Sequence, residues 1–363
     1  MSNLKFKTFL SDEGYGHIVR QRAIIEAMRS LHSGLDITIQ TSRHLDAAKH
    51  LIKGVKAIDR YNNITWHKGH NGSPDLDLIF NEYETYFDRS VSFVENELAE
   101  WEGYDFLISD FVYEAFPLAM RQGVPAFGVA HFTWDWFFAK LYPPPISTKV
   151  MNSFFRMAKQ ATALYFPPFT PEEILRYYHE NAIQVPLIMR SEINHKSTTP
   201  NSKFKVLIMD SGAGVLRQSI LRAMKTVEEL TDFEFFVSSN LEIEQNNISF
   251  IDKDELMVDY IGEMNLVIGR AGFNTISECI GLRTPMLLIG EAMNPEMNEN
   301  ILNLKREGLG TFISMETFET GLNEYLPHFL DHEYKSLLLN MQNHELPVDG
   351  AHVIANNILD RLQ

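Results

Sequence analysis

Short apolar runs alternate along this chain with segments in which apolar residues recur every three or four positions. The run Lys5–Leu10 predicts a strand, and the apolar positions that follow it between Ile18 and Met28 predict a helix. The next run, Asp36–Gln40, predicts a second strand. This order of strand, helix and strand is typical of parallel βαβ units, so we expect an α/β domain with a Rossmann-like, doubly wound parallel sheet.

The same alternation continues through the first half of the sequence. A long amphipathic helix is predicted over residues 79–102, where aromatic and aliphatic residues recur at helical spacing. Strands are predicted at Phe106–Ser109 and Pro125–Ala130, with a helix at Tyr113–Gln122 between them. Between residues 143 and 201, prolines and polar residues interrupt the pattern, and we expect turns and short helices there.

The second half of the sequence repeats this organisation. Helical patterns again separate short strands, which are predicted at Phe204–Met209, 233–237, 266–269 and 285–289. We therefore expect two tandem Rossmann-like domains, residues 1–193 and 204–345, joined by a linker at 194–203. A final helix within residues 346–363 is a candidate to pack back on the first domain. Ligands of such sheets bind beyond the carboxyl ends of the strands, so the site is expected in a cleft that the two domains face.

Length, charge and cysteine content narrow the class of protein. A chain of 363 residues exceeds one ordinary hydrophobic core and fits two domains. Its formal net charge of −16 would repel a phosphate backbone, and no dense stripe of lysine and arginine reverses that charge locally, which excludes nucleic acid as a partner. Cys279 is the only cysteine, so no disulfide can form within the chain, and its apolar helical setting is typical of a core residue.

The N-terminal residues do not resemble a signal peptide, because the apolar run at Leu4–Leu10 is short and interrupted by lysines. No stretch reaches the roughly 18 uninterrupted apolar residues of a membrane-spanning helix. We therefore expect a cytoplasmic protein without an integral membrane segment.

The segment from Gly269 to Glu278 passes from a predicted strand through small residues into a predicted helix. A helix start of this kind presents free backbone N–H groups and a positive dipole end, which suit a diphosphate. Gly272 permits close approach to the backbone, and Arg270 offers a cation. Side-chain hydrogen bonds are available from Asn274 and Thr275, and the carboxylate of Glu278 can accept bonds from ribose hydroxyls. An ordinary ion pair at a helix start is the alternative for Arg270 and Glu278.

This segment resembles the donor signature of the plant UDP-glycosyltransferases, His-Cys-Gly-Trp-Asn-Ser-x-x-Glu. Arg270, Phe273 and Thr275 stand in the places of its His, Trp and Ser. Downstream, residues 296–300 resemble the Asp-Gln-x-x-Asn of the same family, with Met297 in the place of Gln. The resemblance implies that Glu296 and Asn300 contact the donor sugar; a helix-capping role is the alternative for both.

A second glycine turn, with Gly212 and Gly214, follows the strand predicted at Phe204–Met209. Any turn from a strand into a helix can require glycine, so the pattern alone says little. The resemblance to enzymes with the GT-B fold implies that this loop faces the donor phosphates.

The acceptor side has its own candidate residues. Glycosyl transfer to a hydroxyl needs a base, and a histidine held by a carboxylate is suited to that role. His17, after Gly16, follows the first strand, as a Gly-His pair does in plant and many bacterial GT-B enzymes, and Asp110 matches the aspartate that orients their histidine. The alternatives are a structural or capping histidine and an N-cap aspartate.

An aromatic cluster at residues 131–138 follows the strand predicted at Pro125–Ala130. Aromatic rings stack on sugars, which makes Trp134 and its neighbour Asp135 candidates for the acceptor pocket, with burial as the alternative. His67 and His70 lack the spacing of metal ligands, and we expect no bound metal.

Over its whole length the chain resembles the GT-B glycosyltransferases, including bacterial N-acetylglucosaminyltransferases, and most of all the glycosyltransferase-like domain of L-arabinokinases. The shared landmarks are Gly-Tyr-Gly-His at 14–17, Ser109-Asp110, Phe-Thr-Trp-Asp at 132–135, Val-Pro-Leu at 185–187, the block 269–278 and Gly350–Leu359.

The resemblance implies an inverting glycosyltransferase that needs no cofactor and takes its sugar from a nucleoside diphosphate, most simply a UDP-sugar. The acceptor stays open between a small molecule, a lipid-linked sugar and a glycan. Two alternatives remain: a nucleotide-sugar binding or sensing protein without turnover, and a nucleotide-sugar epimerase or hydrolase on the same fold.

Overall fold

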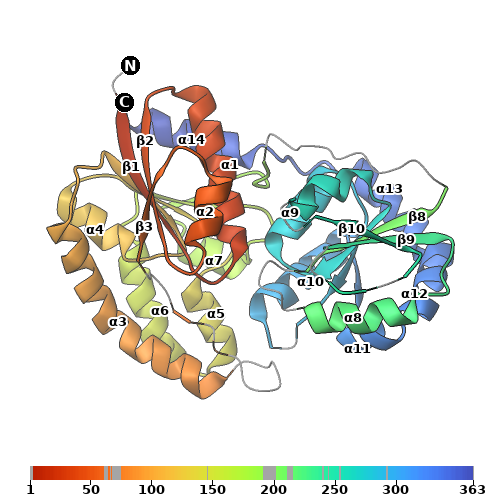
Figure 1. The fold of residues 1–363 in the computed structure, drawn as a ribbon. Coiled ribbons are helices and arrows are strands. Elements are labelled where there is room, and N and C mark those ends of the chain that lie inside the picture. The colour runs from red at the N-terminus through yellow and green to blue at the C-terminus, as the bar shows by residue number, and fades with distance from the viewer. Residues whose placement is uncertain are drawn as a thin grey trace. The chain divides into compact units, whose positions relative to one another are not determined.

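The computed structural model describes residues 3–60, 64–65, 67, 75–144, 146–190, 202–210, 216–238, 241–243, 245–252, 255–291 and 293–362. The chain forms two compact units (Figure 1). The N-terminal unit comprises residues 1–191 and 349–363, and the C-terminal unit comprises residues 192–348. Each contains one parallel sheet with helices, so the predicted fold class of two doubly wound α/β domains is confirmed.

The N-terminal unit has a seven-stranded sheet in the order β3-β2-β1-β4-β5-β6-β7. Its strands are β1 (Leu4–Leu10), β2 (Leu35–Thr41), β3 (Lys56–Asp59), β4 (Phe106–Asp110), β5 (Ala126–Val129), β6 (Ala163–Phe166) and β7 (Ala182–Gln184). The chain first builds outward from β1 through β2 to β3 and then returns to place β4 on the other side of β1. The strand order therefore reverses between β1 and β4, which is the place where open α/β sheets bind ligands.

Helices cover both faces of this sheet: α1 (Tyr15–Leu31), α2 (Leu45–Leu51), α3 (Leu76–Ala99), α4 (Ala115–Gln122), α5 (Trp134–Leu141), α6 (Ile146–Ala158), α7 (Glu172–Tyr177) and α14 (Gly350–Arg361). Successive strand residues point to opposite faces. Accordingly, Phe6 and Leu10 of β1 pack with α1 and α14 in one core, while Phe9 packs with the aromatic residues of α3, α5 and α6 in the other.

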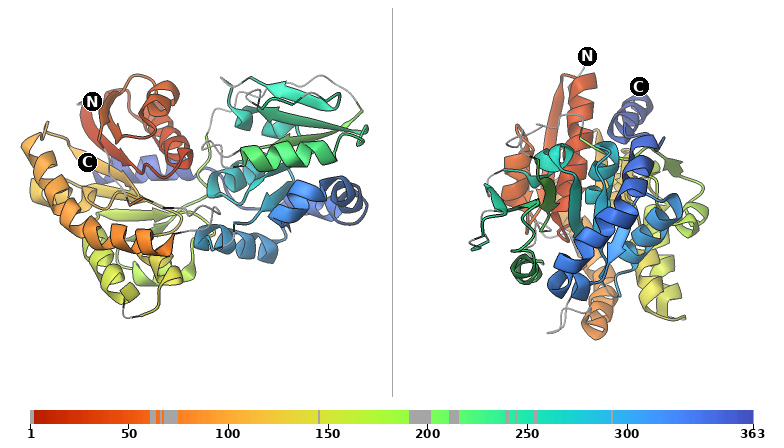
Figure 2. Two further views of the ribbon diagram at one scale, coloured as in Figure 1. Left: turned by 60° about the horizontal axis from the view of Figure 1, so that its bottom comes forward. Right: turned by 90° about the vertical axis from the view of Figure 1, so that its right-hand side faces the viewer.

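The C-terminal helix α14 belongs to the N-terminal unit (Figures 1 and 2). It packs against α1 and buries Ile354 and Ile358 completely. The hydroxyl of Tyr165 in β6 donates to Oδ1 of Asn357 at 2.8 Å, and the N–H of Gly350 donates to the carbonyl of Leu187 at 3.0 Å. These contacts hold α14 in the N-terminal unit.

The C-terminal unit has a six-stranded sheet in the order β10-β9-β8-β11-β12-β13. Its strands are β8 (Phe204–Ile208), β9 (Phe233–Ser238), β10 (Ile248–Ile251), β11 (Leu266–Arg270), β12 (Met286–Ile289) and β13 (Thr311–Ile313). Its helices are α8 (Arg217–Thr226), η1 (Met257–Glu263), α9 (Phe273–Gly281), α10 (Pro295–Glu307), α11 (Met315–Thr320), α12 (Leu322–Phe329), η2 (Leu330–Tyr334) and α13 (Lys335–Asn343). The strand order reverses here between β8 and β11, so both units share one plan.

One prediction about the chain's organisation is wrong. The segment 143–201 was expected to contain only turns and short helices, but it contributes strands β6 and β7 and the 13-residue helix α6. Strand β6 has only four residues, all buried, and ends just before Pro167. An apolar run that short fits a strand or a helix equally well, so its pairing with β5 and β7 decides its conformation. The predicted linker at 194–203 lies outside the described residues except for its last two positions.

Candidate active site

His17 and Asp110 lie together at the reversal point of the N-terminal sheet. Strands β1 and β4 are hydrogen-bonded neighbours, with Leu10 opposite Asp110 at their carboxyl ends. Asp110 is the last residue of β4, and His17 lies in the first turn of α1, directly after Gly16. Their separation of 93 positions in sequence becomes a contact of 2.7 Å between Nδ1 of His17 and Oδ1 of Asp110.

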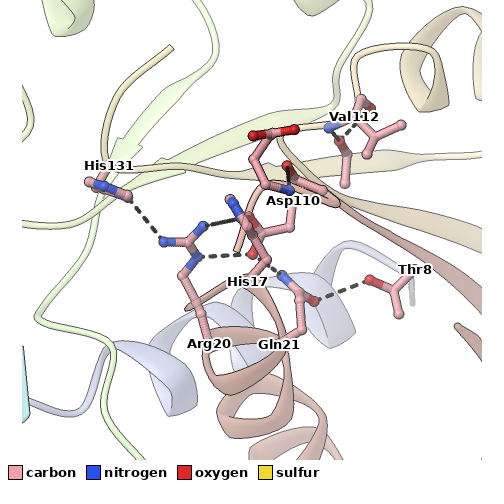
Figure 3. A network of polar contacts seen from close by, with 10 residues as sticks. Thr8, His17, Arg20, Gln21, Asp110, Val112 and His131 are labelled. Atoms are coloured by element: carbon pink, nitrogen blue, oxygen red, sulfur yellow. Dashed lines mark hydrogen bonds and ion pairs between the residues drawn. The ribbon is translucent and has the colours of Figure 1, made fainter. Parts of the chain in front are cut away.

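The carboxylate of Asp110 accepts four hydrogen bonds (Figure 3). Oδ1 is bonded by Nδ1 of His17 and by an Nη of Arg20, and Oδ2 by Nε of Arg20 at 2.9 Å and by Nε2 of Gln21 at 3.2 Å. An ionised carboxylate offers about four acceptor positions, so this one is saturated. Asp110 can therefore orient His17 and balance its charge, but it has no lone pair left to act as a nucleophile or base.

Asp110 is fully buried, and burial alone would raise its pKa. The charges of Arg20 and His17 and the hydrogen bonds from both outweigh that effect and lower the pKa of Asp110 from 3.8 to about 2. The carboxylate is therefore ionised throughout the physiological pH range.

The turn after β4 fixes the direction of the Asp110 side chain. Phe111 has a backbone φ of 64°, in the left-handed region that non-glycine residues seldom occupy. The hydroxyl of Ser109 spans this turn, since it accepts from the N–H of Val112 at 3.1 Å and donates to the carbonyl of Val112 at 2.5 Å. The ring of Phe111 then packs edge-on against His17, with centroids 5.3 Å apart.

Three residues of this cluster were not among the predicted site residues: Arg20, Gln21 and His131. Arg20 is 3% exposed and bound to Asp110. Nδ1 of His131, in the loop after β5, lies 3.0 Å from Nη1 of Arg20. The available signal was helical spacing, because positions 17, 20 and 21 share one face of α1.

The predicted acceptor-side residues Trp134 and Asp135 begin α5 and are 5% and 1% exposed. Trp134 packs in an aromatic core with Phe111, Phe132 and Phe137. Burial raises the pKa of Asp135 to about 6, although hydroxyls around its carboxylate oppose that rise. The structure thus shows Trp134 and Asp135 buried. Any contact of these residues with an acceptor remains a prediction.

In the C-terminal unit, β11 leads through Ala271 into α9. Gly272 is the N-cap residue of α9, and no side chain caps this helix. A Cβ added at Gly272 would meet no atom within 4 Å, so the backbone at this point is open to approach. Asn274 and Thr275 in the first turn are half-buried, whereas Glu278 is 6% exposed.

Arg270, at the end of β11, forms an ion pair with Glu291 in the loop after β12, and both side chains are 19% exposed. Asp210, just after β8, lies near Arg270 as well: burial raises its pKa, and the charges of Arg217 and Arg270 oppose that rise. Arg270, the cation predicted to bind a phosphate, thus has two carboxylates near it. A bound diphosphate would have to compete with Glu291 for this guanidinium.

The residues predicted to contact the donor sugar lie on α10. Asn294 caps this helix by accepting from the N–H of Met297 at 3.2 Å, and Met297 is 4% exposed. Glu296 is half-buried in the first turn. Asn300 is buried and donates to the carbonyl of Ala271 at 2.9 Å, so it holds the turn between β11 and α9.

Gly212 and Gly214 lie outside the described residues. Across the described ranges, no three His, Cys, Asp or Glu side chains gather in a way that could hold a metal ion. Within the same ranges, every helix is too short or too polar to span a bilayer.

Comparison with known proteins shows that part of this chain is similar to glycosyltransferases. Residues 218–356 match the model of the glycosyltransferase family 28 C-terminal domain. Among curated proteins, the chain is similar to the UDP-N-acetylglucosamine–N-acetylmuramyl-(pentapeptide) pyrophosphoryl-undecaprenol N-acetylglucosamine transferase of Thermosipho africanus, with 28% identity over 149 residues, 39% of this chain and 43% of that protein. A transferase of the same description from Geobacillus thermodenitrificans is 25% identical over 182 residues, 46% of this chain and 51% of that protein. The chain thus spans about half the length of these relatives.

Solved structures match the entire chain. The glycosyltransferase of kitacinnamycin superposes with a TM-score of 0.68 at 13% identity and covers 100% of both chains, and the calicheamicin glycosyltransferase CalG4 has a TM-score of 0.68 at 12% identity, covering 100% of this chain and 99% of its own. The spinosyn rhamnosyltransferase SpnG complexed with thymidine diphosphate has a TM-score of 0.66 at 14% identity and covers 98% and 100%.

The fold of this protein is therefore that of the GT-B glycosyltransferases, as the sequence predicted. The segment that matches the glycosyltransferase family 28 C-terminal domain, residues 218–356, contains the β11–α9 turn and α10 and ends within α14. The resemblance to the glycosyltransferase-like domain of L-arabinokinases is more specific than these matches and stays a prediction.

Proposed function

We propose that this protein is an inverting glycosyltransferase that moves a sugar from a nucleoside diphosphate, with UDP as the nucleotide, to a hydroxyl group of its acceptor. The observation that carries the proposal is the contact of 2.7 Å between Nδ1 of His17 and Oδ1 of the buried Asp110 at the reversal point of the N-terminal sheet. The match of the C-terminal half to a glycosyltransferase domain supports the same class of reaction.

His17 is the proposed base. With Nδ1 directed at Asp110, the proton of the neutral ring lies on Nδ1, and Nε2 is left to accept a proton. The side chain of His17 is 13% exposed while that of Asp110 is fully buried, so the imidazole is the reachable member of the pair. As the acceptor oxygen attacks the anomeric carbon, Nε2 takes its proton, and Asp110 balances the charge of the imidazolium.

The proposed donor site is the start of α9. The leaving diphosphate gains negative charge during transfer, and the backbone N–H groups at the start of α9 together with Arg270 can stabilise it. The open backbone at Gly272 allows a phosphate to approach closely. These groups supply the positive charge without a metal ion, so we propose a reaction that persists when divalent cations are chelated.

UDP is proposed because the curated relatives are described as acting with UDP-N-acetylglucosamine. SpnG, which shares the fold, was solved with thymidine diphosphate, so TDP is the second nucleotide to test. For the acceptor, a lipid-linked sugar, a small metabolite and a glycan are the three classes to supply.

The test is release of UDP from UDP-N-acetylglucosamine, UDP-glucose and UDP-galactose, measured with and without each class of acceptor and in the presence of EDTA. Release that requires an acceptor and yields a product of inverted anomeric configuration supports the proposal. Binding of a UDP-sugar without release supports a sensing protein, and release of free sugar or an isomerised donor without acceptor supports a hydrolase or epimerase.

A further inference from the structure

Arg20 is a buried charge to which the proposed transfer gives no role. It follows His17 by one turn of α1, and its side chain is 2% exposed. Nε and Nη2 donate to the two carboxylate oxygens of Asp110, and Nη1 lies 3.0 Å from Nδ1 of His131. Nη2 also lies 3.2 Å from Nδ1 of His17. One guanidinium thus contacts the carboxylate and both histidines (Figure 3).

These contacts determine which nitrogen of each ring carries a proton. A guanidinium can only donate, so Nδ1 of His131 must be the acceptor and the proton of that neutral ring lies on Nε2. Nδ1 of His17 donates to Asp110, so the proton of that ring lies on Nδ1. The two histidines are therefore held in opposite tautomers by one ion pair.

The same contacts set the charge of the cluster. Arg20 and Asp110 neutralise each other, so the cluster has no net charge while His17 is neutral. A proton on His17 would add a second cation 3.2 Å from Nη2 of Arg20. His131 and His17 both contact Arg20.

We propose that Arg20 is a positioning residue of this site. It fixes Asp110, which holds His17 through its Nδ1 proton, and it fixes the His131 tautomer. The kinetic part of this inference rests on the proposed transferase function. Its effect on the two rings is a property of the unliganded protein and can be measured without turnover.

The first test is ¹⁵N NMR of the histidine rings in the full-length protein, with His17→Asn and His131→Asn used for assignment. In the wild type, Nδ1 of His131 should be the unprotonated nitrogen of its ring and Nδ1 of His17 the protonated one. In Arg20→Gln, His131 should become a mixture of tautomers. A wild-type His131 protonated on Nδ1 would overturn the proposal even if Arg20→Gln does not fold.

The second test is the pH dependence of transfer, once an acceptor is known. Arg20→Gln should lower kcat at least about tenfold with the KM for the donor unchanged, and the acid limb of its pH profile should move to higher pH. Arg20→Lys keeps the charge but cannot bridge Asp110 and His131, so it should lower kcat while the profile stays in place. If Arg20→Gln lowers stability but leaves the profile and the His131 tautomer unchanged, Arg20 is merely structural.

Discussion

Nδ1 of His17 and Oδ1 of Asp110 are 2.7 Å apart, although 92 residues separate them in the chain. The contact exists because β1 and β4 are neighbours in the sheet and both end at the same edge. The donors bound to Asp110 leave it only one task in catalysis, which is to hold and balance His17. In the transfer that we propose, the imidazole of His17 therefore takes the proton of the acceptor.

Replacing His17 should therefore slow transfer strongly without weakening the binding of the donor. His17→Gln should lower kcat by about 10²–10⁴-fold, the usual contribution of a general base, because no other group of the described cluster can accept the proton. The KM for the donor should stay within a few-fold of the wild type. Steady-state release of the nucleotide measures both quantities.

His50 provides the matched control, since it is an exposed histidine on α2 that lies outside the cluster. His50→Gln should behave like the wild type. Wild-type rates in His17→Gln would show that the base is another residue.

The attachment of α14 depends on a glycine. A Cβ at Gly350 would lie 2.2 Å from the carbonyl oxygen of Pro186 and 2.9 Å from that of Leu187, both of them backbone atoms. Gly350→Ala should therefore destabilise the N-terminal unit by about 2–3 kcal/mol, as overpacking does. Urea unfolding followed by tryptophan fluorescence measures the change. Gly14→Ala is the control, because its added Cβ meets nothing within 4 Å, and equal stabilities of the two variants would contradict the account.

Lys7 and Glu97 form a buried ion pair between β1 and α3, with 2.5 Å between Nζ and Oε2 and side chains 4% and 3% exposed. Burial lowers the pKa of Lys7, and Glu97 opposes that shift. Glu97→Gln should cost about 3 kcal/mol, because it leaves Lys7 charged and buried without its counter-ion.

Lys7→Met should change stability by less than about 1 kcal/mol, since Glu97 keeps its second partner, Arg60. A double-mutant cycle measured in urea compares the two changes. If both variants lose the same free energy of unfolding, the desolvation of Lys7 does not determine the contribution of this ion pair to stability.

Glu114 makes the stability of the fold depend on pH near neutrality. Burial raises its pKa from 4.5 to about 7, although Tyr86, whose hydroxyl donates to Oε2 at 2.8 Å, opposes the rise. Between pH 4.5 and 7 the unfolded chain has lost this proton while the folded protein keeps it, so stability falls as the pH rises through that window. The raised pKa of Asp135, about 6, acts in the same direction.

Glu114→Gln, which is neutral at every pH, should therefore lose less Tm between pH 5 and pH 8 than the wild type. The exposed Glu84→Gln is the control and should follow the wild type. A Glu114→Gln variant with the full wild-type loss would show that Glu114 is not protonated in the fold.

Much of the fold was predictable because buried parallel strands are short apolar runs, and β1, β4, β5 and β11 each stand out in this way. Strands at the sheet edges were not predicted. Residues of β3 and β10 are mostly half-buried or exposed, with Phe250 47% exposed, so they lack the apolar run of a central strand. Their conformation depends on pairing with β2 and β9.

The site was predictable where a local motif carries it and not where it depends on distant contacts. His17 and Gly272 follow strand ends in small-residue turns, which a sequence displays. Helical spacing places Arg20 on the same face of α1 as His17, but its role depends on Asp110 and His131, which are 90 and 111 positions away and which the spacing does not reveal. For Asn300 the local motif was not sufficient. The motif predicted a contact with the donor sugar, whereas the structure shows a hydrogen bond to the carbonyl of Ala271.

The most direct test of the central claim is binding of UDP to the wild type and to Gly272→Val, measured by isothermal titration calorimetry. A Cβ at Gly272 meets no atom within 4 Å, so valine should cost only the modest loss of a glycine N-cap while its side chain occupies the place proposed for the diphosphate. We expect that the wild type binds UDP and that Gly272→Val binds it at least about tenfold more weakly, a loss of about 1.4 kcal/mol. Equal binding by the two proteins, or no binding of UDP or TDP by the wild type, would contradict it.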